Sequence, residues 1–473
     1  MKLKELITNE KPFDGYLDAE VYSIHTDSRG VRSGGILFLT RDGKDNWNYA
    51  QDGLNNGAIC VVSDKKLDLP RNVVVQDVKA ELRNALNRFY CNILDSFSFI
   101  GITGTNGKTT TAHVIYDVLR NSGIKVGVIG TLGAKWCEKK VELVNTTPSF
   151  VEFCRVLSLM KKDGVTHVVC EVSAHAISQD RLCGQKFDIG VFTNVSQDHL
   201  DYFGDMEGYR SAKLKFFEEY VSGYSIVNSD TEEGRLIARK MSNRTLTYGL
   251  QNPADVFGID YEEFDCGQRF TLNLMDEIYI VESKLMGEFN RYNLLAGITV
   301  CRLLGVKGKK LVEGIKSINE VDGRFKVYKG DKTVIIDYAH TPDGMLNVLG
   351  EIKRFYRGKI SCVFGCGGER DKTKRPLMGK IAEQLCDVVV LTEDNSRGEK
   401  TEDIIADIVG GMSVQPIIIE DRRDAIEFAI KNAKNDEIVV ILGKGAEKYL
   451  EKCGKREYFS DEEEVEKSIY SVT

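Results

Sequence analysis

The chain has 473 residues, with 64 basic and 71 acidic side chains and a net charge of −7. This length exceeds what one hydrophobic core usually organises, so we expect about three domains. Hydrophobic residues make up 42%, as in ordinary globular proteins, and the mild acidity gives no electrostatic reason to expect binding to nucleic acid or to a membrane surface.

Twelve cysteines are scattered along the chain and form no CxxC pair. Disulfide frameworks are dense in short secreted chains, and zinc sites use ligands paired closely in sequence, so we expect reduced thiols and no zinc. The first residues, MKLKELITNEKPFDG, contain no apolar core of signal-peptide length, and no run reaches the ~20 apolar residues of a membrane span. The sequence therefore predicts a cytoplasmic protein without a membrane span.

Residues 1–95 carry short apolar runs followed by a helical pattern. The strands are expected at Val21–His25, Ile36–Leu39, Ala58–Val62 and Asn72–Val75, and the helix at Lys79–Asn92. This alternation predicts a small N-terminal α/β domain.

Residues 96–325 alternate longer apolar runs with helices. Strands are expected at Phe97–Thr103, Lys125–Ile129, Thr166–Glu171, Asp188–Asn194 and Ser225–Asn228, and helices at Lys108–Arg120 and Tyr292–Leu304. Apolar strands of this kind indicate a mainly parallel sheet covered on both faces. Residues 250–285 instead have the pattern of antiparallel strands and are expected to form a β insert.

Residues 326–473 contain five further apolar runs, TVIIDYA, ISCVFGC, DVVVLTED, PIIIED and EIVVILGKG, with helices between them. We expect a Rossmann-like, doubly wound domain, in which ligands bind at the C-terminal ends of the strands. The polar residues at these ends are Asp337–His340, Gly365–Arg370, Asp394–Arg397 and Gly443–Glu447. The predicted fold is thus α/β with three domains, 1–95, 96–325 and 326–473.

A glycine-rich loop stands between the strand that ends at Thr103 and the following helix. Its residues are Gly104, Thr105, Asn106, Gly107, Lys108, Thr109 and Thr110. In such a loop backbone N–H groups surround phosphate oxygens, the lysine contacts the β- and γ-phosphates, and the Thr109 hydroxyl binds magnesium. Ile102 stands where the strict pattern has glycine or alanine, so this is a variant loop. Nucleotide binding alone does not separate a ligase from a kinase, an ATPase or a switch GTPase.

The variant TGTNGKTTT resembles the ATP loop of the Mur ligases and of the related folylpolyglutamate and cyanophycin synthetases. Other segments resemble the MurE type of Mur ligase, in order along nearly the whole chain. They are His25–Phe38, Asn145–Pro148, Glu171–His175, Gln179–Leu182, Asp198–Met206, Gly287–Ala296, Gly323–Arg324, Asp337–Gly344, Gly365–Pro376 and Gly443–Glu447. The resemblance implies that ATP phosphorylates the terminal carboxylate of a UDP-N-acetylmuramoyl-dipeptide, and that the amine of a diamino acid then displaces the phosphate. It also implies a monomer.

The resemblance assigns roles to residues around ATP. Nucleotide contacts beyond the loop are implied for Asn290, Asn293, Arg324, Asp337 and His340. Magnesium ligands are implied for Thr109, Glu171, His199 and Lys213, the last as a carbamate formed with CO2. The catalytic set is Lys108, Glu171, His199, Lys213 and Arg324. From the residues alone, Glu171 could be a surface acid, His199 and His340 structural histidines, and Lys213 a lysine on a solvated helix face.

Two further sets are implied by the resemblance. Contacts to the UDP-peptide are Ser28, Asn145, Thr146, Thr147, Ser173, Gln179 and Arg181. Contacts to the incoming amino acid are Arg370, Asp394, Asn395, Arg397, Gly443 and Glu447. The guanidinium of Arg397 suits the second carboxylate of meso-2,6-diaminopimelate, which L-lysine lacks. Ser396 replaces the proline, and Ala446 the histidine, of the diaminopimelate pattern, so L-lysine and lanthionine remain alternatives.

Two rival functions are less favoured. A folylpolyglutamate-type ligase lacks the N-terminal uridine-nucleotide domain that His25–Phe38 suggests. A non-catalytic regulator or nucleotide switch on the same fold need not keep a full reaction set, whereas this chain keeps Lys108, Glu171, His199, Lys213 and Arg324.

Overall fold

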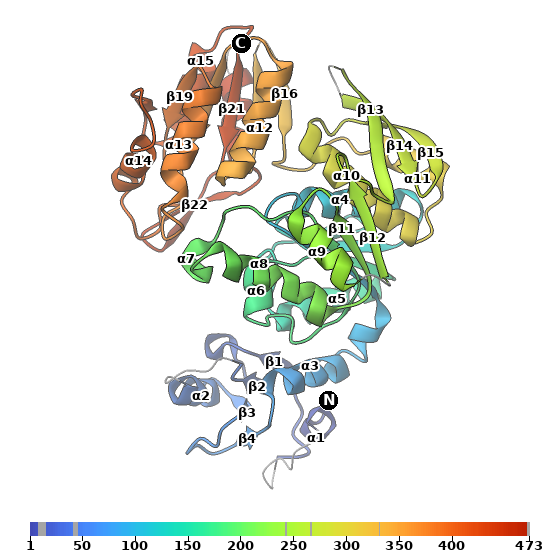
Figure 1. Cartoon of the computed structure of the whole chain (residues 1–473). Coiled ribbons are helices and arrows are strands. Elements are labelled where there is room, and N and C mark those ends of the chain that lie inside the picture. The colour runs from blue at the N-terminus through green and yellow to red at the C-terminus, as the bar shows by residue number, and fades with distance from the viewer. Residues whose placement is uncertain (8–15, 41–45, 242–243, 265–266, 331, 471–473) are drawn as a thin grey trace. The chain divides into compact units, whose positions relative to one another are not determined.

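The computed structural model describes residues 1–7, 16–40, 46–241, 244–264, 267–330 and 332–470, which form a mixed α/β structure (Figure 1). Packing divides the chain into two compact units. The first comprises Met1–Ile100, Ile124–Asp188 and Glu219–Ser222, and the second Gly101–Gly123, Ile189–Glu218 and Gly223–Thr473. The three domain boundaries expected above remain a prediction.

The N-terminal part of the first unit is a four-stranded parallel sheet with helices. Its elements are α1 (Leu3–Leu6), β1 (Ser23–His25), β2 (Gly35–Phe38), α2 (Asn46–Asn55), β3 (Ala58–Ser63), β4 (Asn72–Val74) and α3 (Val78–Phe89), and the strands follow chain order. The strands and α3 agree with the predictions to within three residues. Helix α2 was not predicted, because it buries only Ala50, Gly53 and Leu54 and so has little apolar periodicity.

The rest of the first unit carries the edge at which Glu171 lies. Its elements are β6 (Val126–Gly130), β7 (Gly133–Trp136), β8 (Lys139–Val141), α5 (Phe150–Lys162), β9 (His167–Glu171) and α6 (Ala174–Ser178). Strands β6 and β9 pair in parallel, whereas β6, β7 and β8 are antiparallel neighbours. The Ser149 hydroxyl caps α5 by accepting the N–H of Glu152. Strands β5 (Ser98–Thr103), β10 (Phe187–Phe192) and β11 (Val221–Asn228) each continue from one unit into the other.

The second unit includes the glycine-rich loop and the helix that follows it, α4 (Lys108–Asn121). Further elements of this unit are α7 (Leu200–Phe203), α8 (Met206–Lys215), α9 (Glu232–Lys240), β12 (Thr245–Gly249), β13 (Val256–Phe264), β14 (Gly267–Leu274), β15 (Glu277–Ser283), α10 (Glu288–Leu303) and α11 (Gly308–Lys316). Strands β13–β15 are antiparallel, which confirms the predicted insert, although its residues 265–266 lie outside the described residues. A Cβ on Gly297 of α10 would lie 2.5 Å from Val114 of α4, so glycine permits this close helix pair.

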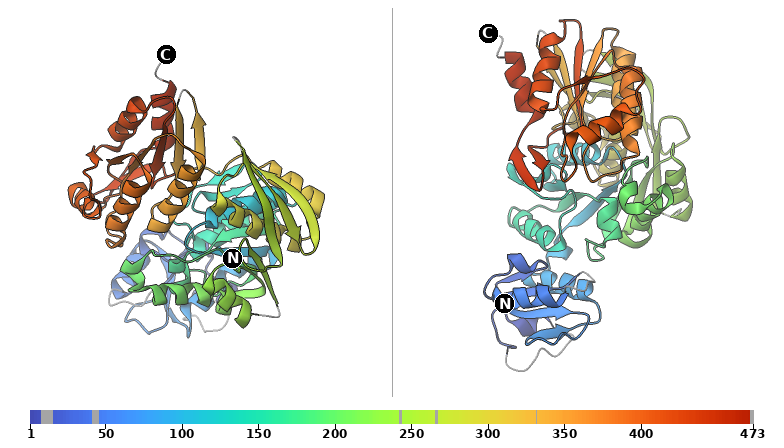
Figure 2. Two further views of the ribbon diagram at one scale, coloured as in Figure 1. Left: turned by 45° about the horizontal axis from the view of Figure 1, so that its top comes forward. Right: turned by 90° about the vertical axis from the view of Figure 1, so that its left-hand side faces the viewer.

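The C-terminal part is a doubly wound sheet, as predicted. Its strands are β16 (Lys326–Lys329), β17 (Thr333–Asp337), β18 (Ile360–Phe364), β19 (Val388–Leu391), β20 (Ile417–Ile418) and β21 (Ile438–Leu442), in the order β16-β17-β21-β18-β19-β20. Helices α12 (Pro342–Phe355), α13 (Lys374–Leu385) and α14 (Thr401–Val409) cover one face, and α15 (Arg422–Asn432) and α16 (Asp461–Tyr470) the other (Figures 1 and 2). A hairpin, β22 (Tyr449–Lys452) and β23 (Lys455–Tyr458), follows β21.

Strands β17, β21, β18, β19 and β20 run parallel to one another, whereas the edge strand β16 is antiparallel to β17. Their C-terminal ends therefore meet at one edge, where the polar segments after β17, β18, β19 and β21 lie. Among the described helices none is both long and apolar enough for a membrane span. The cysteines of the described residues are free thiols.

Candidate active site

The glycine-rich loop is held in shape by the segment that follows β10. Gly104 and Gly107 have φ angles of +152° and +84°. A Cβ on Gly104 would lie 1.8 Å from Thr193 Oγ1, and one on Gly107 would lie 2.3 Å from Asn293 Oδ1. Asn194 accepts the N–H of Asn106 through its side chain at 2.9 Å. Glycine is therefore required at both positions, and the loop is built before any nucleotide enters.

Two cations of the predicted catalytic set lie on this loop. Lys108 Nζ donates to the carbonyl oxygens of Gly104 and Thr105, each at 2.8 Å. Arg324 Nη2 donates to Thr109 Oγ1 at 2.9 Å. Because these cations stand at the N-terminus of α4, the region is positive and suited to phosphate groups.

The two predicted asparagines connect α10 to the first turn of α4. Thr111 Oγ1 donates to Asn293 Oδ1 at 3.3 Å, and Asn293 Nδ2 donates to Asn290 Oδ1 at 3.0 Å. Asn290 Nδ2 in turn donates to the carbonyl oxygen of Met286 at 2.7 Å. The structure thus brings both asparagines to the loop, and their contacts to ATP stay a prediction.

Lys213 is a buried lysine. It is 1% exposed on α8, and its ammonium nitrogen lies 4.3 Å from the centroid of the Tyr209 ring. Burial, and next the charge of Lys108, lower the pKa of Lys213 well below its ordinary value, against an opposing effect of Asp198. The interpretation of Lys213 as a lysine on a solvated face is therefore wrong, because aromatic packing removes the amine from water.

Asp198, which the sequence analysis did not single out, gathers three nitrogen groups around one buried carboxylate. His199 Nε2 lies 3.2 Å from Oδ2, Lys374 Nζ 3.5 Å from Oδ1 and His340 Nε2 3.9 Å from Oδ2. Burial alone would raise the pKa of Asp198, but Lys374 and the two histidines outweigh it and hold the pKa below its ordinary value. Asp198 thereby orients both predicted histidines. Its signal in the sequence was its place directly before His199.

Asp337 and His340 follow β17. The carboxylate of Asp337 accepts the backbone N–H groups of Phe325 and Ala339, both at 2.7 Å, and so ties the segment carrying Arg324 to the sheet edge. Burial raises the pKa of Asp337, while Arg324 opposes the shift. Burial, and then Lys374, lower the pKa of His340 to about 4, which leaves its imidazole neutral near pH 7.

Glu171, in the first unit, is 1% exposed and not a surface acid. The N–H of Thr131 donates to Oε1 at 2.9 Å and its hydroxyl lies 3.1 Å from Oε2. The Thr131 hydroxyl also lies 3.1 Å from that of Thr146. Thr131 was missed by sequence reasoning, because a threonine after a strand carries no distinctive pattern. The role of Glu171 as a magnesium ligand stays a prediction.

Several residues predicted to contact the UDP-peptide lie beside Glu171. Thr147 Oγ1 donates to the carbonyl oxygen of Glu171 at 2.8 Å and accepts the N–H of Ser173 at 3.0 Å. Arg181 donates to the Thr147 carbonyl oxygen and to Gln179 Oε1, each at 2.9 Å. These hydroxyl, amide and guanidinium groups form one polar cluster.

The same predicted set also includes Asn145, which directly precedes Thr146 in the chain, and Ser28. Asn145 is exposed. Ser28 belongs to the N-terminal sheet region, where Asn56 donates to its carbonyl oxygen at 3.0 Å. Within the described residues Ser28 forms no hydrogen bond with the cluster, so its role rests on the resemblance.

The polar strand ends of the C-terminal sheet meet around a second buried lysine. Lys444 Nζ lies 3.7 Å from Asp394 Oδ1 and 3.3 Å from Glu447 Oε2. Asn395 Nδ2 donates to Glu447 Oε2 at 3.0 Å, and Tyr338 donates its phenol to Oε1 at 3.2 Å. Burial would raise the pKa of Asp394, but Lys444 outweighs it and the pKa is lowered. Asp394, Asn395 and Glu447 are thus together, while Lys444 and Tyr338 had not been predicted.

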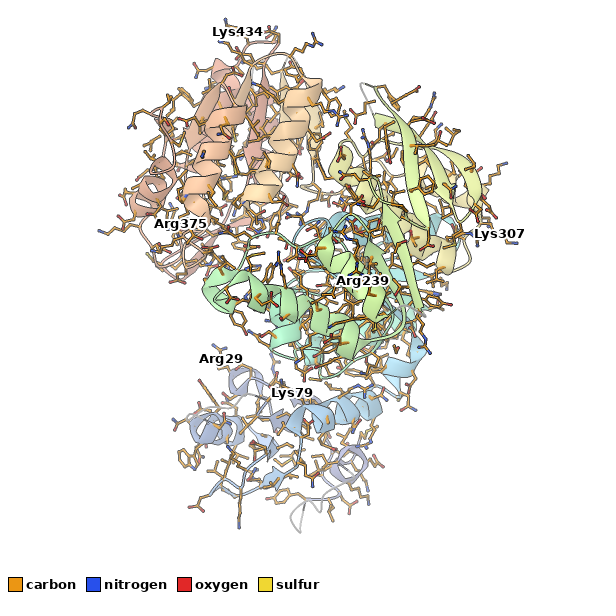
Figure 3. The ribbon with its side chains drawn as sticks, viewed as in Figure 1. Arg29, Lys79, Arg239, Lys307, Arg375 and Lys434 are labelled. Carbon is orange, nitrogen blue, oxygen red and sulfur yellow. The ribbon has the colours of Figure 1, made fainter. Side chains whose placement is uncertain are left out.

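Arg397, Arg370 and Arg375 differ in their surroundings. Arg397 has a φ of +52° and donates to the carbonyl oxygen of Gly368 at 2.7 Å. Arg370 is exposed and donates to the adjacent Glu369 carbonyl oxygen. Arg375, labelled on α13 in Figure 3, is buried, pairs with carboxylates of Glu399 and Asp407, and donates to the Gly367 carbonyl oxygen. Arg375 therefore supports the loop that presents Arg370.

The donor set fits magnesium carried by a nucleotide. Within the described ranges no three His, Cys, Asp or Glu side chains converge on a possible metal position. Magnesium takes oxygen ligands and commonly keeps waters and substrate phosphates, so it does not need such a cage. The Thr109 hydroxyl, 3% exposed at the start of α4, is an oxygen donor of the expected kind.

Comparison with known proteins identifies the family. Residues 102–301 match the Mur ligase middle domain, and residues 323–445 match the Mur ligase glutamate ligase domain. The chain belongs to the Mur ligase family.

Its relatives include two proteins named UDP-N-acetylmuramoyl-L-alanyl-D-glutamate--2,6-diaminopimelate ligase. The protein of Halalkalibacterium halodurans is 39% identical over 91% of this chain and 90% of its own length. That of Clostridium acetobutylicum, numbered 1 of that name, is 37% identical over 99% of both. A solved structure of a ligase with this name has a TM-score of 0.70 and 32% identity, and the match covers 100% of this chain and 99% of that one.

Proposed function

We propose that this protein is an ATP-dependent ligase that joins meso-2,6-diaminopimelate to UDP-N-acetylmuramoyl-L-alanyl-D-glutamate in peptidoglycan biosynthesis. The observation that carries the proposal is that one compact unit contains three features of such a ligase. They are a preformed phosphate loop, the buried amine of Lys213 and the cluster of carboxylates around Lys444. The names of the relatives support the substrates, since their identity extends over nearly the whole chain.

The first chemical step is phosphoryl transfer. A terminal carboxylate oxygen of the UDP-peptide attacks the γ-phosphorus of ATP, the bond to the β-phosphate oxygen breaks, and ADP and an acyl phosphate result. Such a transfer needs positioning and charge neutralisation rather than an enzyme nucleophile. Lys108 and Arg324 provide cations at the loop, and Thr109 is the residue that would hold magnesium, which supplies further neutralisation when bound.

The second step forms the amide bond. A neutral amine of the diamino acid attacks the acyl carbon and forms the C–N bond of a tetrahedral intermediate. The nitrogen then loses a proton, the C–O bond to the phosphate breaks, and the proton and inorganic phosphate leave. Asp394 and Glu447 are suited to bind the distal ammonium group, while Arg397 is suited to the distal carboxylate. L-lysine lacks that carboxylate, so it would leave the guanidinium unmatched.

Lys213 supports a modification that the family resemblance implies. Its neutral amine can attack the carbon of CO2 and lose a proton, which yields a carbamate anion. Burial and the neighbouring Lys108 favour the neutral amine that this reaction requires. The product places an anionic oxygen donor beside the phosphate loop where a neutral amine stood.

The test is phosphate release from ATP with magnesium and the UDP-dipeptide, with meso-diaminopimelate, L-lysine or lanthionine added in parallel. We expect release that requires the UDP-dipeptide and is fastest with diaminopimelate. Faster release with L-lysine would retain the ligase and reject the proposed amino acid. Absence of release with all three, together with activity on folylpolyglutamate substrates, would overturn the proposal.

A further inference from the structure

Tyr338 contacts both halves of the proposed site. It follows β17 directly after Asp337 and is one residue that the sequence analysis had not assigned. Its ring lies 4.2 Å from the guanidinium carbon of Arg324. Its phenol donates to Glu447 Oε1 at 3.2 Å. One side chain thus touches the arginine at the phosphate loop and the carboxylate of the amino-acid pocket.

Arg324 is held between this ring and the loop. Its Nη2 donates to Thr109 Oγ1 at 2.9 Å. A cation over an aromatic face is attracted by the ring quadrupole, and half-buried Arg324 lies over the Tyr338 ring with part of its surface removed from water. The orientation of the Tyr338 ring therefore influences where the guanidinium lies.

The backbones of the two segments also touch. A Cβ on Gly323 would lie 2.0 Å from the backbone nitrogen of Ala446, and one on Gly445 would lie 2.5 Å from the carbonyl oxygen of Gly323. There is no space between the residue before Arg324 and the loop that carries Glu447. A shift of the amino-acid loop must therefore move its neighbour, because packed interiors have few voids to absorb it.

Glu447 is a well-defined partner for the phenol. Its Oε2 accepts from Asn395 at 3.0 Å and lies 3.3 Å from Lys444 Nζ, which leaves Oε1 for Tyr338. Burial, and next the charge of Glu447, raise the pKa of the Tyr338 phenol well above its ordinary value. The phenol consequently remains a donor to the carboxylate throughout the neutral range.

We propose that Tyr338 is a positioning residue that couples occupancy of the amino-acid pocket to the placement of Arg324 at the phosphate loop. This deepens the proposed ligase function and rests on it. An ammonium group bound by Glu447 orders that carboxylate, the ordered carboxylate holds the phenol, and the ring holds the guanidinium. The same linkage runs in reverse, because coupling of binding free energies is reciprocal.

The experiment measures the dissociation constant of a non-hydrolysable ATP analogue with magnesium, with and without saturating meso-diaminopimelate. In the wild type we expect diaminopimelate to tighten binding by about fivefold or more. Tyr338→Phe keeps the ring and removes the phenol, so we expect that factor to fall below about twofold and the KM for diaminopimelate to rise about tenfold. The KM for ATP should change much less.

Tyr338→Leu also removes the ring, so we expect it to weaken binding of the analogue even without amino acid. Tyr248→Phe is the matched control, because it removes another buried phenol, which donates to the Phe192 carbonyl oxygen at 2.9 Å outside the proposed site. It should keep the full coupling factor. A purely structural role for Tyr338 would instead give equal effects in Tyr338→Phe and Tyr248→Phe.

Full coupling in Tyr338→Phe, or none in the wild type, would overturn the inference. Its failure is distinguishable from failure of the ligase function, which is read from phosphate release in the wild type. Coupling of the two ligands without phosphate release would reject the ligase and retain Tyr338 as the link. Phosphate release in the wild type, together with unchanged coupling in Tyr338→Phe, would retain the ligase and reject Tyr338 as the link.

Discussion

Two lysines are almost completely buried in the proposed site, and their surroundings differ. Lys213 is 1% exposed and stands over the Tyr209 ring, and the charges that act on it are those of Lys108 and Asp198. Lys444 is 0% exposed and lies within 4 Å of two carboxylates, at 3.7 Å from Asp394 and 3.3 Å from Glu447. Residue type and burial are the same, but the neighbouring charges are not.

The difference teaches that neighbours, rather than burial alone, decide what a buried amine does. Burial and the nearby charge of Lys108 lower the pKa of the Lys213 amine against an opposing effect of Asp198, which favours the neutral form of this amine. An amine among carboxylates instead acts as a fixed donor that orients them.

Replacing Lys213 should have the largest effect. In Lys213→Ala we expect kcat for phosphate release to fall about a thousandfold, because a charged group beside the transferring phosphate is lost. Labelled bicarbonate should give a carbamate carbon signal in the wild type and none in the variant. Lys215→Ala, two residues along the same helix, is the matched control and should stay close to wild type. Equal activity of the two variants would remove Lys213 from the mechanism.

Arg397 should control the choice of amino acid. In Arg397→Ala we expect kcat/KM for meso-diaminopimelate to fall about a hundredfold, with a far smaller change for L-lysine, because only diaminopimelate offers the second carboxylate. Arg397→Lys keeps the positive charge but lacks the planar guanidinium, so its kcat/KM for meso-diaminopimelate should lie between those of the wild type and Arg397→Ala. Steady-state kinetics with both amino acids provide the measurement. A parallel loss for both would assign Arg397 to folding of the loop instead.

Lys444 should matter for stability as well as for binding. Lys444→Met leaves Asp394 and Glu447 without their buried cation, and we expect the free energy of unfolding to fall by about 3 kcal/mol. Denaturant titration measures the change. Lys431→Met, which removes an exposed partner of Glu427 in the same sheet region, should change stability little. If the free energy of unfolding falls equally little in both variants, the ion pairs of Lys444 do not stabilise the pocket.

The smallest expected effect is a shift in acid stability. The pKa of Asp394 lies below its ordinary value in the folded protein, so the unfolded chain binds protons more readily near that value. This contribution is fully present above the unfolded pKa of 3.8 and is lost as the pH falls through the lower folded pKa. Removing the cation in Lys444→Met raises the folded pKa and moves the loss to higher pH. Unfolding titrations between pH 3 and 6 test this, and an unchanged acid limb would contradict it.

Sequence patterns were sufficient for the architecture and for the phosphate loop. The strands of the N-terminal sheet, five of the six strands of the C-terminal sheet, the helix after Gly107 and the antiparallel insert follow from local periodicity and turn residues, whereas β16 was not predicted. Helices such as α2 and α5 were not predicted. For α2 the reason is physical, since few of its side chains reach the core and tertiary packing supplies its stability.

Some residues of the site were likewise found from local sequence patterns, and others only from the folded structure. The residue sequence by itself identified Lys108, Thr109 and the polar strand ends, because a phosphate loop and a doubly wound sheet have local signatures. The contacts of Asp198 with His199, Lys374 and His340 arise from the packing of separate segments, which no local pattern shows.

The same limit applies to the two lysines and to Tyr338. YRSAKLKFF reads as a charged helix, and GKGAE as a polar turn. Burial of Lys213, pairing of Lys444 and the position of Tyr338 between Arg324 and Glu447 depend on residues more than a hundred positions apart in some cases. Pairings over such separations are set by packing of whole elements, and no local pattern encodes them.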